Sequence, residues 1–526
     1  MQFNAKGANF PRARESSIRI GLVELPAIRL CDENGRNWAA CRQHEPLVNK
    51  QILISQLRGD GFDASLVNLK RGTSEHIFGE AAWKGLSLKK IFVGTAIEEY
   101  RADEFDVWGF TVNYTQEREI GCRFIRHLTS HGARVIVGGS DALAVPGPYL
   151  DAGATSIVTD KSGAINRAAI EYVMGWPENK TWRQLTVSGN GRLLGRRGPA
   201  LSPEDWPLPE VDVAASCFGT RYWECDIPNH LLPIGSAVLD IGCDRKCDFC
   251  QTPNYKLGYK GMSPKTAIRW LARQKEAGAG SVICVSDQFL GRVLWDSGRD
   301  EVLEIMRGTR DLDLPILWGN GLEIKKATRG RGLPGGDPTP DERLCKALWG
   351  WDGRSGCYNA YIPGERPIEG DKSYEKLLPW NHHLTLLRAI VQAGVPDITY
   401  GIIVGMPDDS DDKLARFEEA LYELWQTLIS ENHDLRFRIT PFAIRPLPGT
   451  PQTQILERDN LIAFDDPAIC GGFWTACANT KHMTYERVSY WQSRLAMIGD
   501  IRYLQSAQVT GIIRRESEKD LVGAVN

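Results

Sequence analysis

The sequence predicts an α/β protein with two successive parallel sheets, and three observations lead to this fold class. Segments with strand-like and helix-like patterns alternate along most of the 526 residues, as they do in parallel sheets covered by helices. At roughly 150 residues per domain, this length suggests about two to four domains. The segment 200–213 is rich in proline and reads as a stiff linker. We expect an open Rossmann-like sheet in residues 1–198, a proline-rich linker in 199–229, six strand–helix units in 230–455 and a small, mainly helical capping region in 456–526.

The first region reads as an open sheet of five strands. The strands are expected at 18–26, 62–70, 105–114, 133–142 and 154–158, and helices at 47–61 and around 115–131. Ligands bind such sheets at the carboxyl ends of the strands, where Gly138 and Gly139 would let a ligand approach the backbone closely. A nicotinamide site does not fit, because the GxGxxG pattern is absent after the first strand.

Six further strand-like segments follow the linker, and polar side chains stand at the ends of three of them. The segments are 236–242, 281–289, 314–321, 356–365, 397–409 and 435–451. The polar residues are Ser286, Asp287 and Gln288, then Asn320 and Glu323, then Glu365 and Arg366. Each residue alone reads as a helix cap or a solvated charge. Three strand ends together favour a bound polar ligand, because barrels of alternating strands and helices carry their chemistry at the carboxyl ends of the strands.

The composition argues against two classes of partner. A net charge of -3 gives no indication of a nucleic acid or an anionic membrane surface. No apolar run reaches the ~18–20 residues that span a bilayer, and the N-terminal residues lack the apolar core of a secretory signal. We therefore expect a cytoplasmic protein with no nucleic-acid or membrane partner, in which most of the 13 cysteines are buried thiols rather than disulfides.

Cys243, Cys247 and Cys250 are the cysteines whose spacing suggests metal binding. The pattern C-x3-C-x2-C can bring three thiolates to one metal site on a tight loop. A [4Fe–4S] cluster usually takes four cysteine ligands, so three ligands leave one iron open to a small molecule. Zinc is the competing interpretation, but structural zinc sites commonly use two separated pairs of ligands, and the sequence has no second CxxC pair.

The triplet and its setting resemble the radical S-adenosylmethionine superfamily, whose motif is C-x3-C-x-aromatic-C after a strand. Phe249 holds the aromatic place here. The resemblance implies a [4Fe–4S] cluster on the three thiolates, S-adenosylmethionine on the open iron, Phe249 near its adenine and a partial (β/α)6 barrel around them. The other residues that the resemblance assigns to S-adenosylmethionine are Ser286, Asp287, Gln288, Glu323, Glu365 and Gly405. Ser286 departs from the family, which has an acidic residue in its place.

An α/β domain that precedes the barrel resembles the cobalamin-binding (class B) members of this superfamily. The turn at Gly138 and Gly139 and the segment after it match that subclass. Two departures are Asp141, where the family usually has histidine, and the segment 159–163, where the family has Gly-Glu-Gly-Glu. A D-x-H-x-x-G motif is also absent, so the resemblance implies cobalamin without a histidine on its lower face. The residues assigned to cobalamin are Tyr114, Gly138, Gly139, Ser140, Thr159, Asp160 and Arg71.

The commonest reaction in this subclass is methyl transfer to carbon, and this chain has a distant likeness to the tryptophan 2-C-methyltransferase type. The resemblance implies three cofactors, namely a [4Fe–4S] cluster, S-adenosylmethionine and cobalamin. It also implies a small-molecule substrate of natural-product type and an electron donor such as flavodoxin or ferredoxin. Two alternatives stay open: a cyclase, oxidoreductase or ring-rearranging enzyme on the same scaffold, and a non-catalytic iron–sulfur or cobalamin sensor. The sequence identifies no catalytic residue.

Overall fold

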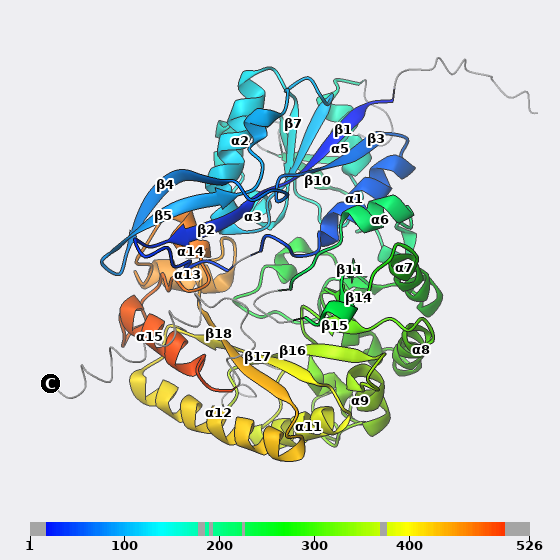
Figure 1. Ribbon diagram of the computed structural model, residues 1–526, viewed down its shortest axis with the longest axis vertical. Coiled ribbons are helices and arrows are strands. Elements are labelled where there is room, and N and C mark those ends of the chain that lie inside the picture. The colour runs from blue at the N-terminus through cyan, green and yellow to red at the C-terminus, as the bar shows by residue number, and fades with distance from the viewer. Residues whose placement is uncertain are drawn as a thin grey trace, which may run out of the picture.

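The structure is a computed structural model that describes residues 17–40, 42–176, 185–188, 193–222, 227–368 and 376–499, with only the backbone described for 185–188. Figure 1 shows the N-terminal sheet above the second sheet, with the C-terminal helices beside both. The expected two-sheet α/β fold class is confirmed. Residues 223–226 of the expected linker and the tail from residue 500 lie outside the described residues.

The N-terminal sheet has seven strands in the order β3-β1-β6-β7-β8-β10-β9, and all neighbours are parallel except β10 and β9. The strands are β1 (Arg19–Glu24), β3 (Asp63–Asn68), β6 (Val107–Thr111), β7 (Val135–Gly138), β8 (Ser156–Val158), β9 (Leu185–Ser188) and β10 (Leu193–Arg196). The helices are α1 (Val48–Gly59), α2 (Arg118–Ser130), α3 (Ser140–Ala144), α4 (Gly147–Asp151) and α5 (Asn166–Val173). The five expected strands are confirmed as β1, β3, β6, β7 and β8. The strand order reverses between β1 and β6, which is where ligands bind sheets of this topology.

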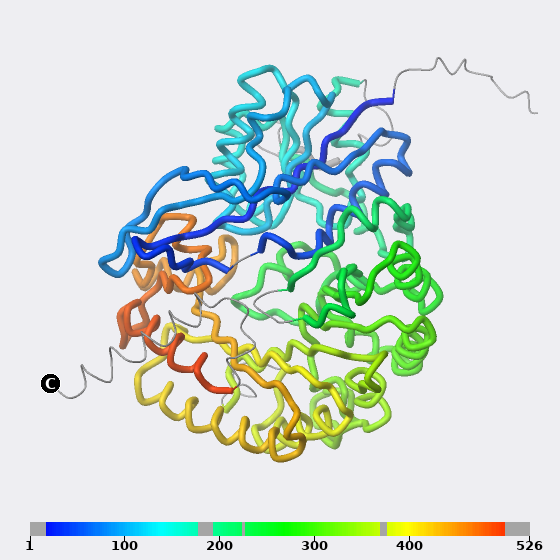
Figure 2. The backbone as a smooth tube through the Cα atoms, viewed as in Figure 1, coloured from blue at the N-terminus to red at the C-terminus, as the bar shows by residue number. Residues whose placement is uncertain are grey.

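A three-stranded antiparallel sheet was not predicted from the sequence. It consists of β2 (Ala27–Cys31), β5 (Leu86–Val93) and β4 (Glu75–Trp83) in the order β2-β5-β4. Lys84 and Gly85 join β4 to β5 with positive φ angles of 51° and 73°, as tight hairpin turns require. The indole N–H of Trp83 donates to the carbonyl of Ala476 at 2.9 Å. This sheet therefore connects the N-terminal domain to the C-terminal region, and Figure 2 shows the two segments side by side.

The second sheet has six parallel strands whose spatial order follows the chain. The strands are β11 (Ile234–Ala237), β14 (Ser281–Cys284), β15 (Ile316–Trp318), β16 (Cys357–Glu365), β17 (Asp397–Val404) and β18 (Arg436–Ala443). The helices are α7 (Pro264–Glu276), α8 (Gly298–Asp311), α9 (Glu342–Trp349), α11 (Trp380–Gln392) and α12 (Asp411–Glu431). A short pair, β12 (Asp240–Ile241) and β13 (Lys260–Gly261), follows β11. The six expected strands are confirmed, as is their arrangement as a partial barrel that remains open between β11 and β18.

Helix α7 illustrates how the sequence produces these covering helices. The Ser263 hydroxyl accepts from the Thr266 N–H at 3.3 Å and caps the first turn, and Pro264 follows at the first helical position. The buried residues Ala267, Trp270, Leu271 and Gln274 recur at helical spacing on the face that packs on the sheet. The helix ends before Gly278, whose φ is 96°.

A buried polar bridge joins the two domains. The Gln51 amide on α1 donates to the Ser236 carbonyl at 2.7 Å, and the Gln274 amide on α7 donates back to Gln51 Oε1 at 3.0 Å. All three residues are buried. The segment between the domains is not wholly extended, because it contains α6 (Val211–Ser216) and inserts the Trp206 indole against the carbonyl of Ser162 at 3.1 Å.

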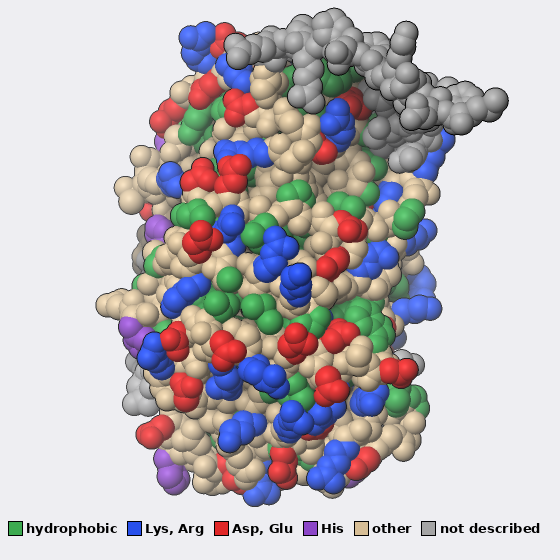
Figure 3. Space-filling model, turned by 90° about the vertical axis from the view of Figure 1, so that its right-hand side faces the viewer, with side chains coloured by type: hydrophobic (Ala, Val, Ile, Leu, Met, Phe, Trp, Pro, Cys, Tyr) green, Lys and Arg blue, Asp and Glu red, His purple; other side chains and the backbone are tan. Residues whose placement is uncertain are grey.

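The C-terminal region is mainly helical within the described residues, as expected. It contains α13 (Pro451–Arg458), α14 (Pro467–Gly471) and α15 (Tyr485–Leu495), and α15 packs on β17 and β18. None of the described helices has the length and apolarity needed to cross a membrane. On the face of the molecule in Figure 3, acidic and basic side chains are intermixed.

A buried ion pair fixes the turn after β17. The Asp409 carboxylate accepts from Arg366 Nη1 at 3.0 Å and from the backbone N–H groups of Gly405 and Met406 at 2.9 and 3.0 Å. Both charged side chains are almost fully buried. Because water is excluded from this pair, each charge depends on the other for its stability.

We predict that Asp409→Asn destabilises the protein by about 3–5 kcal/mol, because it leaves the buried Arg366 guanidinium without its carboxylate. Thermal unfolding followed by circular dichroism measures the effect as a lower melting temperature. Asp459→Asn is the matched control, because its partner Arg458 is largely exposed, and it should leave the melting temperature unchanged. Equal melting temperatures for the two variants would contradict the assignment.

Candidate cofactor site

The three cysteines lie on a loop directly after β12. Gly242 starts the loop with a φ of 80°, and a Cβ atom at this position would collide with the Gly258 carbonyl oxygen at 1.9 Å. The Cys243, Cys247 and Cys250 thiols are free and half-buried. A turn brings the last two together, because the Cys250 N–H donates to the Cys247 carbonyl at 3.2 Å.

The electrostatics of this loop show that the three thiols share one environment. Burial raises the pKa of Cys247 to about 12, Lys376 opposes the shift, and Cys250 and Cys243 add to it. The Cys247 thiol therefore favours its protonated form until a metal centre compensates the charge of its thiolate. Among the described residues, no three His, Cys, Asp or Glu side chains are arranged to hold a single metal ion. A four-iron cluster does not require such an arrangement, because each thiolate binds a different iron.

The residues that follow β14 make hydrogen bonds that support the start of this loop. The Ser286 hydroxyl accepts from the Leu239 N–H at 2.9 Å, and the Asp287 carboxylate accepts from the Gly242 N–H at 2.7 Å. The Gln288 N–H donates to Asp240 at 2.9 Å. Ser286, Asp287 and Gln288 thus all contact the segment that leads into the cysteines. Their contact with S-adenosylmethionine stays a prediction.

Glu323 lies at the centre of a buried charge cluster beside the loop. Its carboxylate pairs with Arg245 at 2.6 Å and with Lys326 at 3.0 Å, and it accepts from the Gln288 amide at 2.8 Å. Lys326 also pairs with Asp244 at 2.7 Å. Asp244 and Arg245, between Cys243 and Cys247, are therefore tied to the segment that follows β15, which limits the motion of the loop.

Glu365 and Phe249 both lie close to Lys376, which is near Cys247. Glu365 ends β16 with a positive φ of 51°, an unusual conformation for a residue other than glycine. Its carboxylate pairs with Lys376, whose Nζ lies 5.5 Å from the centre of the Phe249 ring. Sequence reasoning missed Lys376, which stands outside any expected strand end.

Gly405 is needed for steric reasons in the turn after β17. Its φ is 80°, and a Cβ atom there would lie 2.7 Å from Val488 Cγ1 on α15. The geometry explains why glycine occupies this position, while its contact with S-adenosylmethionine stays a prediction.

The structure places most of the residues assigned to cobalamin along the carboxyl edge of the N-terminal sheet. Tyr114 follows β6, and Gly138, Gly139 and Ser140 join β7 to α3. Gly139 has a φ of 106°, and a Cβ there would lie 2.1 Å from the Val112 carbonyl. The backbones of two strand ends therefore approach each other closely at this glycine.

Asp141, which departs from the family's histidine, is a structural residue. It is buried, pairs with Arg118 at 2.7 Å and accepts from the Tyr149 hydroxyl at 2.6 Å. These contacts hold the α3 and α4 segment against α2. They give the Asp141 carboxylate a local role in folding.

Thr159, Asp160 and Arg71 have different surroundings. The Thr159 hydroxyl donates to the Leu194 carbonyl at 3.0 Å, and Asp160 pairs with Arg196 at 2.6 Å. Arg196 in turn donates to the Lys256 carbonyl of the second domain at 3.0 Å. Arg71 is exposed and lines a hollow beside α1 and α6, so the structure does not bring it together with the others.

Lys161 and Tyr255 form a junction between the two domains that sequence reasoning missed. The Tyr255 hydroxyl, just after the cysteine loop, donates to Ser140 Oγ at 2.8 Å. The Lys161 ammonium donates to Ser140 Oγ at 3.0 Å and to Asn113 Oδ1 at 3.2 Å. Burial lowers the pKa of Lys161 to about 8 although Asp287 and Asp160 oppose the shift. The signal available in the sequence was the lysine in segment 159–163, where the resembling family has acidic residues.

A second buried charge cluster lies where the strand order of the N-terminal sheet reverses. Glu24 ends β1 and pairs with Lys70 at 2.6 Å and with Lys50 at 3.5 Å. Glu117 lies nearby, and burial raises its pKa to about 7, with Glu24 adding to the shift and Lys70 opposing it. These residues come from segments far apart in sequence, so no local pattern reveals them.

We predict that Lys161→Met stabilises the cofactor-free protein at pH 7. The pKa of Lys161 falls from its ordinary value of 10.5 to about 8 on folding, so the unfolded chain binds more protons between these pH values and wild-type stability rises with pH there. The advantage of Lys161→Met should therefore be largest below pH 8 and shrink as the pH rises towards 10.5. Melting temperatures measured from pH 7 upward test this, with the exposed Lys265→Met as control. A pH-independent difference would refute the interpretation.

Comparison with known proteins gives a structural match but no sequence match. No family model and no curated protein matches the sequence. The structure of the cobalamin-dependent S-adenosylmethionine radical enzyme OxsB with aqua-cobalamin and S-adenosylmethionine bound aligns with a TM-score of 0.64 at 14% identity, covering 91% of this chain and 66% of OxsB. OxsB with aqua-cobalamin bound gives 0.62 at 14% identity with the same coverage. The apo, selenomethionine-labelled form gives 0.59 at 15% identity, covering 91% and 65%.

This chain spans about two thirds of the length of OxsB. The likeness extends over both sheets, because it covers nine tenths of this chain. The chain therefore has the fold of a cobalamin-dependent radical S-adenosylmethionine enzyme.

Proposed function

We propose that this protein is a cobalamin-dependent radical S-adenosylmethionine enzyme that acts on a small molecule. The observation that carries the proposal is the cysteine loop at the carboxyl end of the barrel, held against the carboxyl edge of the N-terminal sheet through Tyr255 and Ser140. OxsB has the same fold, and one of its structures has aqua-cobalamin and S-adenosylmethionine bound.

In this proposal the cysteines hold the cluster and a neighbouring amide donates to one of the ligand sulfurs. When bound, the cluster, S-adenosylmethionine and cobalamin would supply radical chemistry and a transferable methyl group. Cys243, Cys247 and Cys250 would hold the cluster. The Gln288 amide, 3.9 Å from Cys243 Sγ, is placed to donate to a ligand sulfur, a contact that tunes the potential of such clusters.

The domain junction would keep the two cofactors facing one space. Tyr255 and Arg196 link the cysteine-loop side to the sheet edge where cobalamin is expected, and Lys161 Nζ lies 5.3 Å from the centre of the Tyr255 ring. These contacts would also limit the access of water to the space between the cofactors, which protects reactive species.

We further propose methyl transfer to a carbon atom of a natural-product-type substrate as the reaction, with an electron donor such as flavodoxin or ferredoxin. The support is the resemblance of the sequence to the class B radical enzymes. Cyclisation, oxidation or ring rearrangement without methyl transfer is the alternative on the same scaffold.

We predict that Cys250→Ala abolishes the reductive cleavage of S-adenosylmethionine and lowers the iron content after anaerobic reconstitution, because one cluster ligand is lost. Iron analysis and the visible absorption of the cluster measure the effect. Cys122→Ala, a buried thiol on α2 far from the loop in sequence, should retain the wild-type iron content. A full four-iron spectrum in Cys250→Ala would disprove the ligand assignment.

The reaction type is tested with S-adenosylmethionine labelled in its methyl group. We expect label in the product when the reduced, cobalamin-loaded enzyme converts a substrate. Conversion without label would replace methyl transfer by the cyclase or oxidoreductase alternative. Reduced protein that fails to cleave S-adenosylmethionine at all would favour the sensor alternative.

A further inference from the structure

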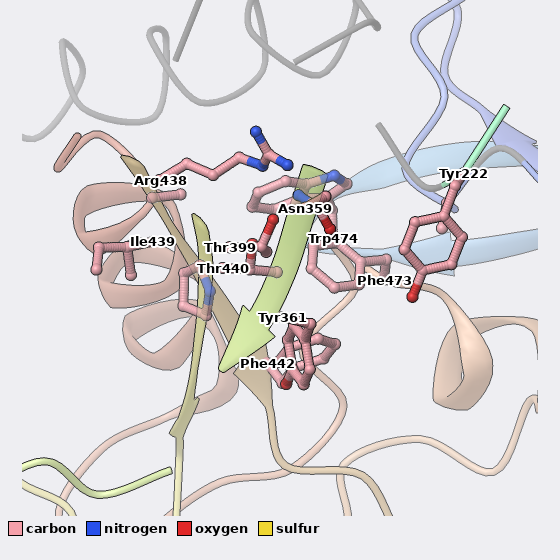
Figure 4. Close-up of a pocket in the computed structure, with 13 residues that line it drawn as sticks. Tyr222, Asn359, Tyr361, Thr399, Arg438, Ile439, Thr440, Phe442, Phe473 and Trp474 are labelled. Carbon is pink, nitrogen blue, oxygen red and sulfur yellow. The ribbon is translucent and has the colours of Figure 1, made fainter. Parts of the chain in front are cut away.

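The inward faces of β16, β17 and β18 line a cavity. Figure 4 shows side chains from several parts of the chain around it. One wall is polar and comes from the barrel strands, and the other is aromatic and comes largely from the linker and the C-terminal region. The lining residues that the argument uses are Tyr222, Asn359, Thr399, Arg438, Phe442, Phe473 and Trp474.

Asp397 organises the polar wall. Its carboxylate pairs with Arg438 at 2.9 Å and with Arg436 at 3.2 Å, and it accepts from the Asn359 amide nitrogen at 2.6 Å. A carboxylate between two guanidinium groups accepts hydrogen bonds and donates none. The Asn359 amide must therefore direct its nitrogen towards Asp397 and its Oδ1 atom away from it.

Asn359 Oδ1 is a buried acceptor without a hydrogen-bond partner in the described structure. The residue is only 1% exposed, so bulk water does not satisfy this oxygen. Its orientation is fixed by Asp397. Buried polar atoms nearly always have a partner, and an unmade hydrogen bond at such a position indicates a missing ligand or water.

Thr399 Oγ1 is a second such atom on the same wall. It is buried and has no hydrogen-bond partner among the described residues. In the sheet register Asn359 lies opposite Asp397, and Thr399 follows two residues later on β17. The two side chains therefore project from neighbouring strands towards the same side of the sheet, and both line the cavity.

The aromatic wall has a fixed geometry. The Tyr222 hydroxyl donates to the Gly319 carbonyl at 2.7 Å, which fixes the position of its ring beside the end of β15. Phe473 packs edge-on against Phe442, with ring centres 5.4 Å apart and an interplanar angle of 84°. Trp474 packs edge-on against Phe473 at 4.8 Å. Preset aromatic faces of this kind suit a flat, apolar ring system.

We infer that this cavity is the substrate site and that it takes a neutral or anionic planar ring system bearing an N–H donor. The donor would bind Asn359 Oδ1 and Thr399 Oγ1, and the ring would lie against the aromatic wall. A cationic ligand is disfavoured, because the Arg438 guanidinium lines the cavity. Naming this ligand a substrate depends on the proposed function, whereas its binding chemistry depends on the cavity alone.

A matched pair of neutral probes tests the donor requirement. 2-Quinolone carries a lactam N–H, and coumarin has the same planar bicyclic shape and carbonyl with a ring oxygen in place of that N–H. Isothermal titration of the full-length, anaerobically reconstituted protein should show 2-quinolone binding about tenfold more tightly, because only its N–H satisfies the buried acceptors. Equal affinity for the two probes, or binding of neither, would overturn the inference.

Two variants test whether the preference for 2-quinolone over coumarin arises in the cavity. Thr399→Val removes an unsatisfied hydroxyl at nearly constant shape, so it should leave the melting temperature unchanged or raised while reducing the preference for 2-quinolone severalfold. Asn359→Leu should abolish the preference. Thr309→Val is the control, because the Thr309 hydroxyl is buried but already donates to the Ile305 carbonyl at 2.8 Å. A preference that survives in both cavity variants would also overturn the inference.

Cleavage of S-adenosylmethionine by the reduced protein without substrate is measured on the same samples. Loss of cleavage with retained probe selectivity would refute the proposed function and leave the binding chemistry intact. Retained cleavage without probe selectivity would refute the inference about the cavity alone.

Discussion

The bracing of the cysteine loop by the end of β14 is the constraint on which the rest of the site depends. Three thiols on a short loop can share a cluster only if the backbone between them is held in one conformation. Ser286, Asp287 and Gln288 each contact a different residue of segment 239–242. The first strand of the barrel and its neighbour therefore fix the start of the loop together. Glu323 extends this support by pairing with Arg245 inside the loop.

The same constraint explains how the two domains face each other. The loop leads directly into Tyr255, whose hydroxyl reaches Ser140 at the carboxyl edge of the N-terminal sheet. A mobile loop would not hold the Tyr255 hydroxyl in position against Ser140. Elsewhere in the interface, Gln51 and Gln274 form a buried hydrogen-bonded bridge. The domain interface thus has polar contacts at two places, and polar contacts are directional enough to set a relative orientation as well as an area of contact.

The fold could be predicted from the sequence to the extent that its signals are local. The strands of both parallel sheets are short apolar runs, and the cysteine spacing is confined to eight residues, 243–250. The antiparallel β2-β5-β4 sheet was missed because its strands carry many charged and exposed residues, as in Glu75–Trp83. Its burial depends on residues near Ala476, about four hundred positions away, and no local pattern carries that information.

Local sequence patterns reveal even less about the contacts in the candidate site. Strand-end residues such as Ser286 and Glu323 could be located because parallel strands present their carboxyl ends at one edge. What these side chains bind could not be predicted, because a polar residue at a strand end serves equally well as a ligand contact or as a brace. Lys161 and Lys376 become noticeable only when folding places them against Ser140 and Glu365.

The two walls of the barrel cavity differ in the same way, because one follows from the pairing of neighbouring strands and the other from contacts between distant segments. Its polar wall belongs to consecutive strands, so the register of β16, β17 and β18 alone brings Asn359, Thr399 and Arg438 together. Its aromatic wall also requires the linker and the C-terminal region, which contribute Tyr222 and Trp474. A change in these covering segments would alter the shape of the cavity while the polar wall stays fixed by the sheet. The strands of the barrel would therefore determine which hydrogen bonds a ligand can make, and they are held rigidly by strand pairing. The linker and the C-terminal region would determine which ligand shapes fit, through the way in which they pack on the barrel.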